Sequence, residues 1–205
     1  MGAEYALFVA APGFAPVTAV SAIPPPIPIS TLAVTNYQEW VDGNLLRFSC
    51  ELSISYEDPI EQINFYNLRL YQQRIHYMIA FNGDTIRNGT SMMALELPEA
   101  TNETWKLAIN TGGILLQDHP FSQALTIPLQ GAVERDRYLT GKIITELRTV
   151  SPEYYNFQSS LSSQPSSIGG GGLTPPVLLR SNVENGLGVF AGYASSTDSV
   201  SVRSR

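Results

Sequence analysis

The sequence predicts an all-β protein built as an antiparallel β-sandwich, with one short helix near residues 151–161. Short apolar segments that alternate with polar residues recur along the 205 residues, and turns rich in Gly, Pro, Asn and Asp separate them. No long helical pattern lies between these segments, which favours an antiparallel sandwich over a parallel sheet. This arrangement is typical of immunoglobulin-like and transthyretin-like folds.

The predicted strands begin at residues 5–10, which Pro12-Gly13 follows as a turn. Four prolines within residues 24–28 cannot pair as a central strand, so they predict an extended connector. The clearest alternation places Phe48, Cys50, Leu52, Ile54 and Tyr56 on a core face and the intervening residues in water. Turns bound this strand at Asp42-Gly43-Asn44 and Glu57-Asp58-Pro59. Further strands are predicted over residues 65–70, 75–81, 93–97, 105–109, 125–129 and 137–150, with a turn at Asn82-Gly83-Asp84.

The predicted helix begins with an N-cap at Ser151, a proline at the first helical position and Glu153 in the first turn. Because about three helical turns are marginal in water, this helix should lie against the sheet. Its predicted apolar face contains Tyr154, Phe157 and Leu161.

The last part of the chain is predicted to hold a loop, a hairpin and a tail. Residues 159–174 are poor in apolar residues and contain four consecutive glycines, so they predict a mobile loop. Residues 175–193 predict a hairpin, in which Asn185 and the glycines supply the positive φ of the turn. The Ser-rich residues 195–205 predict a flexible, frayed tail.

Three units follow from this pattern. Residues 1–30 are interpreted as the terminal strands of an upstream β-module with its proline-rich connector, residues 31–194 as the main sandwich, and residues 195–205 as the tail. The alternative is that residues 1–30 form an edge segment of the same domain. The chain opens inside a strand pattern and lacks a signal peptide there, so we expect it to be a trimmed part of a longer chain.

Composition argues against several classes of function. Only 15% of the residues are charged, the net charge is −6, and Lys106 and Lys142 are the only lysines, so we expect no nucleic-acid binding. No apolar run approaches the roughly 20 residues of a membrane span. The single cysteine, Cys50, excludes an internal disulfide and is interpreted as a buried thiol.

The candidate metal ligands are better explained as structural residues. His76 and His119 fit no zinc spacing, so His76 is expected on the solvent face of a strand and His119 in a loop. Asn82, Asp84 and Asn88 offer oxygen ligands for calcium, but such residues also cap turns, and the spacing matches no calcium loop. We therefore predict neither a metal site nor a cofactor.

Candidate catalytic and modification sites are equally weak. Glu57-Asp58 and the pair Glu96 and Glu99 could supply the two carboxylates of a glycosidase, although such pairs depend on separation across a cleft. No G-x-S-x-G motif supports a serine hydrolase. The glycosylation patterns at Asn88 and Asn102 would be coincidental in a bacterial protein.

Tyrosines are the most suggestive binding residues. They could form a platform for sugars or peptides, since each has an apolar face and a polar tip. They also commonly fill the edges of β-cores, which we favour here. The candidates are Tyr66, Tyr71, Tyr77, Tyr138, Tyr154, Tyr155 and Tyr193.

Two C-terminal segments, Leu147-Arg-Thr-Val-Ser-Pro-Glu-Tyr-Tyr-Asn-Phe157 and Ser181-Asn-Val-Glu-Asn-Gly-Leu-Gly-Val-Phe190, resemble the C-terminal signature of domain-of-unknown-function family 4249. Residues 5–27 and 52–66 also resemble parts of that family. The resemblance implies an exported lipoprotein of Bacteroidota, tethered to the outer membrane and often encoded beside a TonB-dependent transporter. Set against the family pattern, we expect this chain to be without the leader, the lipid-attachment cysteine and most of the first module. The family supplies no catalytic residues to carry over.

The function that we predict is a non-enzymatic accessory or binding module at the cell surface, associated with an outer-membrane nutrient transporter. Its ligand would be a glycan or a peptide, bound at residues that the sequence does not identify. One alternative is an extracellular glycan or peptide hydrolase whose carboxylates are brought together by the fold. The other is a purely structural or adhesive module.

Overall fold

The computed structural model describes residues 2–59, 61–95, 97, 106–107, 112–117, 123–162 and 178–202. These residues form three antiparallel sheets and one helix, so the predicted all-β class with one short helix is confirmed. A small sheet pairs β1 (Ala3–Val9) with β2 (Val17–Ile23). A three-stranded sheet has the order β3 (Ile29–Asp42), β4 (Leu45–Tyr56), β9 (Gln123–Glu134). A six-stranded sheet has the order β11 (Tyr193–Ser201), β10 (Tyr138–Val150), β5 (Phe65–Ile79), β8 (Ile114–Gln117), β7 (Lys106–Leu107), with β6 (Thr85–Ala94) also paired to β5.

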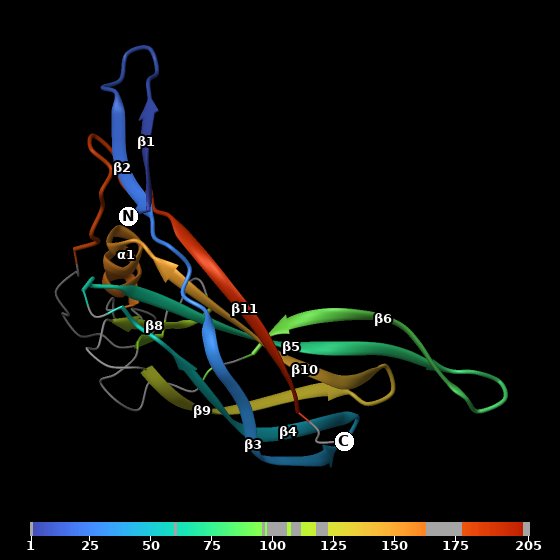
Figure 1. Ribbon diagram of the computed structural model, residues 1–205. Helices are drawn as coiled ribbons and strands as arrows, with labels where there is room; N and C mark the ends of the chain where they lie inside the picture. The colour runs from blue at the N-terminus through green and yellow to red at the C-terminus, as the bar shows by residue number, and fades with distance from the viewer. Residues whose placement is uncertain are drawn as a thin grey trace, which may run out of the picture.

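The two larger sheets pack face to face and enclose one hydrophobic core (Figure 1). The predicted alternation of β4 is confirmed, because every second residue from Phe48 to Tyr56 is buried while the intervening residues are half-buried. Tyr66, Leu68 and other inward residues of β5 meet them from the opposite sheet. Burial of these side chains supplies the main driving force for packing the two layers.

Strand β5 joins most of the six-stranded sheet together. One edge pairs with β10, whereas the other edge is shared by β8, opposite residues 65–68, and β6, opposite residues 71–79. The sequence predicted two strands here, over residues 65–70 and 75–81, and that division was wrong. The polar residues 71–74 stay extended because neighbouring strands satisfy their backbone groups on both edges.

Several other predicted strands lie where expected, but with different limits. Strand β6 begins eight residues before the predicted segment 93–97, and β9 extends beyond the predicted segment 125–129 on both sides. The turns at Gly43 and Gly83 are confirmed, and both glycines adopt the positive φ that these hairpins require. Of the predicted strand 105–109, only residues 106–107 are described, and they form β7.

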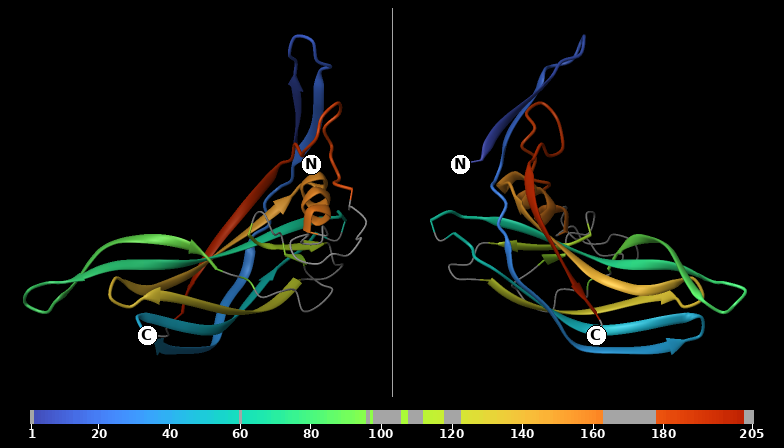
Figure 2. Two further views of the ribbon diagram at one scale, coloured as in Figure 1. Left: turned by 180° about the vertical axis from the view of Figure 1, so that it is seen from behind. Right: turned by 45° about the vertical axis from the view of Figure 1, so that its right-hand side comes forward.

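The β1–β2 hairpin projects from the sandwich (Figure 2). Residues 24–28 form no strand, as the prolines predict, and Ile27 inserts into the main core. Ser21 of β2 donates a hydrogen bond to Glu153 at 2.9 Å and lies 3.1 Å from the Ser151 hydroxyl. The chain is therefore attached to the sandwich on both sides of the connector, by Ser21 before the prolines and by Ile27 among them. The boundary between residues 1–30 and 31–194 stays a prediction.

The helix α1 (Pro152–Ser162) begins where the sequence predicts, and the Tyr154 N–H donates to Ser151 Oγ at 3.4 Å. Tyr154, Phe157 and Leu161 of the predicted apolar face are half-buried, and the most buried helical residues are Gln158 and Ser160. The helix packs on two sides. Tyr155 stacks on Phe65 of β5, with ring centroids 4.6 Å apart, while Ser160 accepts the N–H of residue 180.

The predicted hairpin over residues 175–193 was wrong for its described part. Residues 178–192, which we call the clasp, contain no strand, although Asn185 takes the expected positive φ of 57°. The flexible tail was also wrong for residues 195–201, because β11 pairs with β10 along its whole length. Residues 163–177 and 203–205 lie outside the described residues, and with them most of the predicted mobile loop.

Side-chain hydrogen bonds replace strand pairing within the clasp. The Asn182 amide donates to the carbonyls of Phe190 and Val20 at 2.7 and 3.1 Å, and its Oδ1 accepts the Phe190 N–H at 2.9 Å. Asn185 donates to the Pro16 carbonyl at 2.9 Å, and Glu184 pairs with Thr18 through backbone and side chain. Asn side chains compete with sheet ladders in this way, which explains why an apolar pattern formed no hairpin.

A second polar anchor lies in the loop between β4 and β5. The buried carboxylate of Asp58 accepts hydrogen bonds from the Asn64 amide at 3.0 Å and from the Tyr66 hydroxyl. The Tyr66 ring packs edge-on against Tyr56, with centroids 4.9 Å apart. Asp58 therefore ties the end of β4 to the beginning of β5 across the core.

We expect Asp58→Ala to lower the free energy of unfolding by about 2 kcal/mol, because it removes a buried acceptor that Asn64 and Tyr66 share. Urea denaturation measures this change. Glu57→Ala is the matched control, since its side chain is exposed and should shift stability by less than about 0.5 kcal/mol. Equal effects of the two substitutions would contradict the anchoring role of Asp58.

We expect Asn182→Ala to loosen the clasp locally, because one substitution removes three hydrogen bonds. Hydrogen exchange of the Phe190 amide should accelerate by about tenfold or more, whereas amides in the middle of β5 should keep their protection. Asn88→Ala, an exposed position in β6, is the control. Unchanged exchange at Phe190 would show that the Asn182 side chain does not hold the clasp.

Candidate functional site

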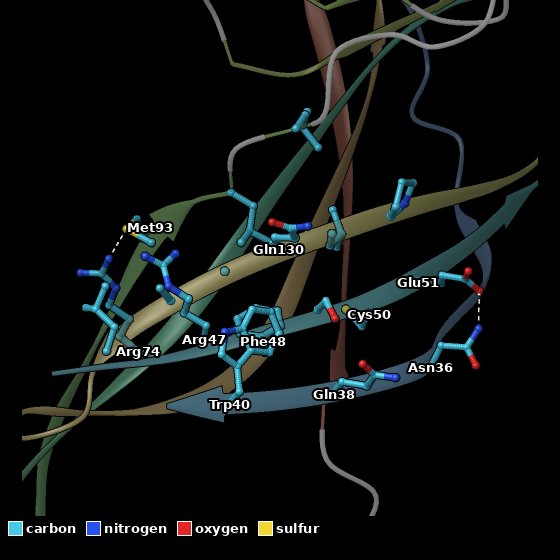
Figure 3. Close-up of a pocket in the computed structure, with 18 of the residues that line it drawn as sticks. Asn36, Gln38, Trp40, Arg47, Phe48, Cys50, Glu51, Arg74, Met93 and Gln130 are labelled. Carbon is cyan, nitrogen blue, oxygen red and sulfur yellow. Dashed lines mark hydrogen bonds between the residues drawn. The ribbon is translucent and has the colours of Figure 1, made fainter. Parts of the chain in front are cut away.

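A cleft of about 930 Å³ opens between the three-stranded sheet and the end of β6 (Figure 3). Its lining combines polar, charged and aromatic side chains from five strands, and Leu97 adds to it. Figure 3 shows Arg47, Arg74 and Met93 at one end of the cleft and Asn36 and Glu51 at the other. The lining residues are Asn36, Gln38, Trp40, Leu45, Arg47, Phe48, Ser49, Cys50, Glu51, Arg74, Met93, Ala94, Leu95, Leu97, Pro128, Leu129, Gln130, Gly131, Ala132 and Glu134.

The floor of the cleft includes residues of β4 that the sequence assigned to solvent. Arg47, Ser49 and Glu51 alternate with the core residues and remain half-buried. The register places Ser49 opposite Gln130 of β9, so these polar side chains share one face of the sheet. The alternation therefore provides an apolar face for the core and a polar face for the cleft.

A bulge in β3 sets which residues complete this floor. Asn36 has a φ of 54°, and the register shifts between Thr35 and Gln38. Beyond the shift, Gln38 pairs with Ser49 and Trp40 with Arg47, on the polar face. The Asn36 amide donates to Glu51 at 2.8 Å. The extra residue thus brings the Trp40 ring, which is 42% exposed, to the cleft.

The opposite wall comes from β5 and from the segment that leaves β6. Strand β6 ends at Ala94, and the Leu95 N–H still donates to the Leu70 carbonyl at 3.0 Å. Leu95 then inserts into the core. This wall exists because β6 covers only the second half of the β5 edge, and the chain turns toward the core where β6 ends.

Charges in the cleft are unevenly compensated. Arg47 forms an ion pair with Asp42 at 2.7 Å, and Glu134 pairs with Arg137 at 3.4 Å. The Arg74 guanidinium lies over the Tyr138 ring, 5.4 Å from its centroid, and contacts the Met93 sulfur. Among the described residues, no carboxylate pairs with Arg74.

Cys50 is a buried free thiol, as predicted, although it borders the cleft. Burial raises the pKa of its thiol from 9.0 to about 11. The thiolate is the reactive form, so this cysteine is a poor nucleophile near neutral pH. It packs as a small apolar side chain in the core cluster.

The candidate metal ligands of the sequence analysis make structural contacts. His76 is half-buried rather than solvated, and its Nε2 lies 2.9 Å from Ser91 Oγ. Asn82 caps its turn as predicted, because its Oδ1 accepts the Asp84 N–H at 3.1 Å, while Asn88 lies in β6. His119 lies outside the described residues. Within the parts of the chain that the structure describes, no three His, Cys, Asp or Glu side chains gather into a metal-binding group.

The predicted carboxylate pairs do not lie in the cleft. Asp58 is buried in its anchor, and neither it nor Glu57 lines the cleft. Glu96 and Glu99 lie outside the described residues. The cleft instead contains Glu51 and Glu134. Glu51 lies opposite Pro128, six residues from Glu134 along β9, which separates the two positions by about 20 Å at about 3.3 Å per residue.

The seven tyrosines form no common platform. Tyr66 is in the core, Tyr155 stacks on Phe65, and Tyr193 lies under the Arg148 guanidinium at 4.3 Å. None of the seven lines the cleft. The remaining four occupy separate positions. The Tyr71 hydroxyl donates to Glu146, and the Tyr77 hydroxyl donates to the Arg135 carbonyl. The Tyr138 ring packs against the His76 ring, and the Tyr154 hydroxyl is buried.

Sequence reasoning missed the cleft residues themselves, above all Trp40, Arg74 and Gln130. One signal in the sequence could have revealed Trp40. Leu32, Val34 and Tyr37 pack against the core, and the step from Val34 to Tyr37 is three residues rather than two. Such a step indicates a bulge, which shifts the following residues to the other face. No comparable local signal marks Arg74, which meets β9 only through packing of the two sheets.

The family model described as "Domain of unknown function (DUF4249)" matches residues 1–199. The chain belongs to this family. Comparison with curated proteins gives no match, and neither does comparison with solved structures. Among the described residues, no helix has the length and apolar character needed to cross a membrane.

The raised pKa of Cys50 gives a pH prediction. The folded state favours the neutral thiol, so its contribution to stability is complete below about pH 9 and is lost as the pH rises to about 11. Cys50→Ala should therefore lose stability less steeply over this interval than the wild type. Denaturation at pH 8, 9, 10 and 11 measures the difference. Parallel curves for the two proteins would contradict the prediction.

Proposed function

We propose that this protein is a non-enzymatic binding module that holds a glycan in the cleft between β9 and the end of β6. The observation that carries the proposal is the lining itself, where an exposed Trp40 ring lies among the side chains of Asn36, Gln38 and Gln130. Sugar rings offer an apolar face for an aromatic ring, and their hydroxyls pair with amides, which both donate and accept.

The cleft favours a glycan over an extended peptide. A peptide would gain most affinity by adding a strand to a free sheet edge. The edge available at the cleft is that of β9, which pairs only with β4 in the three-stranded sheet. Pro128 lies in the middle of this strand and lines the cleft, and proline has no N–H to donate to an added strand.

The cleft also favours binding over hydrolysis. A glycosidase pair requires two carboxyl groups about 5 to 10 Å apart. The register separates Glu51 and Glu134 by about 20 Å. The Glu51 carboxylate also already accepts a hydrogen bond from the Asn36 amide. The support for a binding module is thus that the carboxylates lining the cleft lie too far apart for this chemistry.

Thermal shift against an array of neutral and acidic oligosaccharides tests the proposal. A bound glycan should raise the Tm of the wild-type protein in proportion to its concentration. Trp40→Ala should lower the affinity for that glycan by about tenfold or more, because buried aromatic contacts contribute most of the binding energy at such sites. Val41→Ala is the matched control, since Val41 is the exposed neighbour in β3 and does not line the cleft. Glycan binding that Trp40→Ala leaves unchanged would place the ligand elsewhere.

An accessory role beside a TonB-dependent outer-membrane transporter, in an exported lipoprotein, is the second candidate. It rests on the family resemblance and on one structural observation. The β5–β6 hairpin projects away from the sandwich (Figure 1) and exposes Met78, Ile79, Phe81 and Ile86. Exposed apolar patches of this kind mark protein interaction sites.

Co-purification from the native membrane tests this association. The wild-type protein should retain the transporter, and Ile79→Ser combined with Phe81→Ser should lose it without losing glycan binding. The matched control is Val9→Ser with Phe14→Ser, which changes exposed apolar residues on the β1–β2 hairpin. Failure of the wild-type protein to retain any transporter would contradict the accessory role.

A further inference from the structure

We propose that the glycan carries an anionic group, a carboxylate such as that of a uronic acid, and that Arg74 binds this group. The inference rests on the proposed function and specifies the chemistry of its ligand. It starts from the position of Arg74 on β5, where it lines the cleft from the strand face that also carries Leu70 and Gln72. In Figure 3 the Arg74 side chain lies at the same end of the cleft as Arg47 and Met93.

The Arg74 guanidinium is held in place, and no carboxylate in the described part of the chain pairs with it. Tyr138 supports it from one side, and the Met93 sulfur contacts one of its terminal nitrogens. Its Nε is buried and has no hydrogen-bond partner among the described residues. A half-buried guanidinium without a counter-charge is costly, and an arginine fork fits a carboxylate through two parallel hydrogen bonds.

The other charged residues of the cleft do not supply the missing counter-charge. Arg47 is already paired with Asp42, and Glu134 with Arg137. Glu51 accepts from Asn36 and lies four residues from Arg47 along β4, about 13 Å at 3.3 Å per residue. Among the described residues, none of these carboxylates pairs with Arg74, so an anionic ligand group beside its guanidinium would be stabilised.

Further polar groups without partners lie beside Arg74. Gln72, two residues along the same face of β5, is 0% exposed, and neither of its amide atoms has a hydrogen-bond partner among the described residues. Thr140, opposite Arg74 in β10, also has a buried hydroxyl without a described partner. Buried polar groups in native proteins are nearly always satisfied, so such a group calls for a ligand or water.

Gly131 of β9 lines the cleft and lies close to Gln72. A Cβ at this position would lie 3.0 Å from Gln72 Oε1 and 2.4 Å from the Phe48 ring. The absent side chain leaves the backbone of β9 packed closely against Gln72, next to the cleft surface. Of these groups only Arg74 lines the cleft, and the Gln72 amide and the Thr140 hydroxyl lie buried behind it.

Titration calorimetry with matched probes tests the inference. The probes are galacturonate, alginate and hyaluronan oligosaccharides, each measured beside its neutral methyl ester. We expect at least one acid to bind the wild-type protein about ten- to a hundredfold more tightly than its ester. Arg74→Gln should bring the affinity for the acid down to that for the ester. Arg87→Gln, an exposed position in β6 with the same change of charge, should keep the wild-type ratio.

Arg74→Lys protects the test against a fold defect in Arg74→Gln. It retains the charge but loses the planar fork, so the preference for the acid should fall without disappearing. Equal binding of acid and ester by the wild-type protein would overturn the anionic site and leave the glycan-binding function standing. Binding of none of the oligosaccharides would contradict both proposals. Binding of acidic peptides alone, with the same Arg74 dependence, would contradict the glycan and assign the anion site to peptides.

Discussion

The fold depends on the way that a single strand, β5, is shared by its neighbours. Its first edge pairs with β10, and its second edge is divided between β8 and β6. Every polar backbone group of a buried strand needs a partner, so this division permits the strand to run for 15 residues through a polar middle section. The same division forces the chain to leave the sheet at Ala94, and Leu95 then enters the core.

The cleft is a consequence of that geometry. Where β6 ends, Met93 and Ala94 line the same cleft as residues of β9 and the polar residues of β4. The bulge at Asn36 adds Gln38 and Trp40 to the same face. Polar, aromatic and cationic side chains from both sheets therefore meet at one opening. Each occupies an ordinary strand position, and only their combination suggests recognition of a ligand.

The segments that carry the family resemblance have a different role from the cleft. Residues 5–27, 52–66, 147–157 and 181–190 contain the Asp58 anchor, the helix cap and the clasp, and none of them lines the cleft. Asn182 and its neighbours join the β1–β2 hairpin to the sandwich through hydrogen bonds between distant parts of the chain. The recognisable sequence features thus stabilise the scaffold, and the binding surface is built from other residues.

The sequence by itself determined the fold class, the helix and its cap, the buried face of β4 and the turn glycines, because each depends on local periodicity or local backbone geometry. Only the tertiary structure decided that residues 195–201 form β11, that residues 65–79 form one strand, and that the clasp is irregular. These features depend on partners far away in the chain. The candidate site belongs to the second group, since nothing local to Arg74 shows that it meets β4 and β9 across the sandwich.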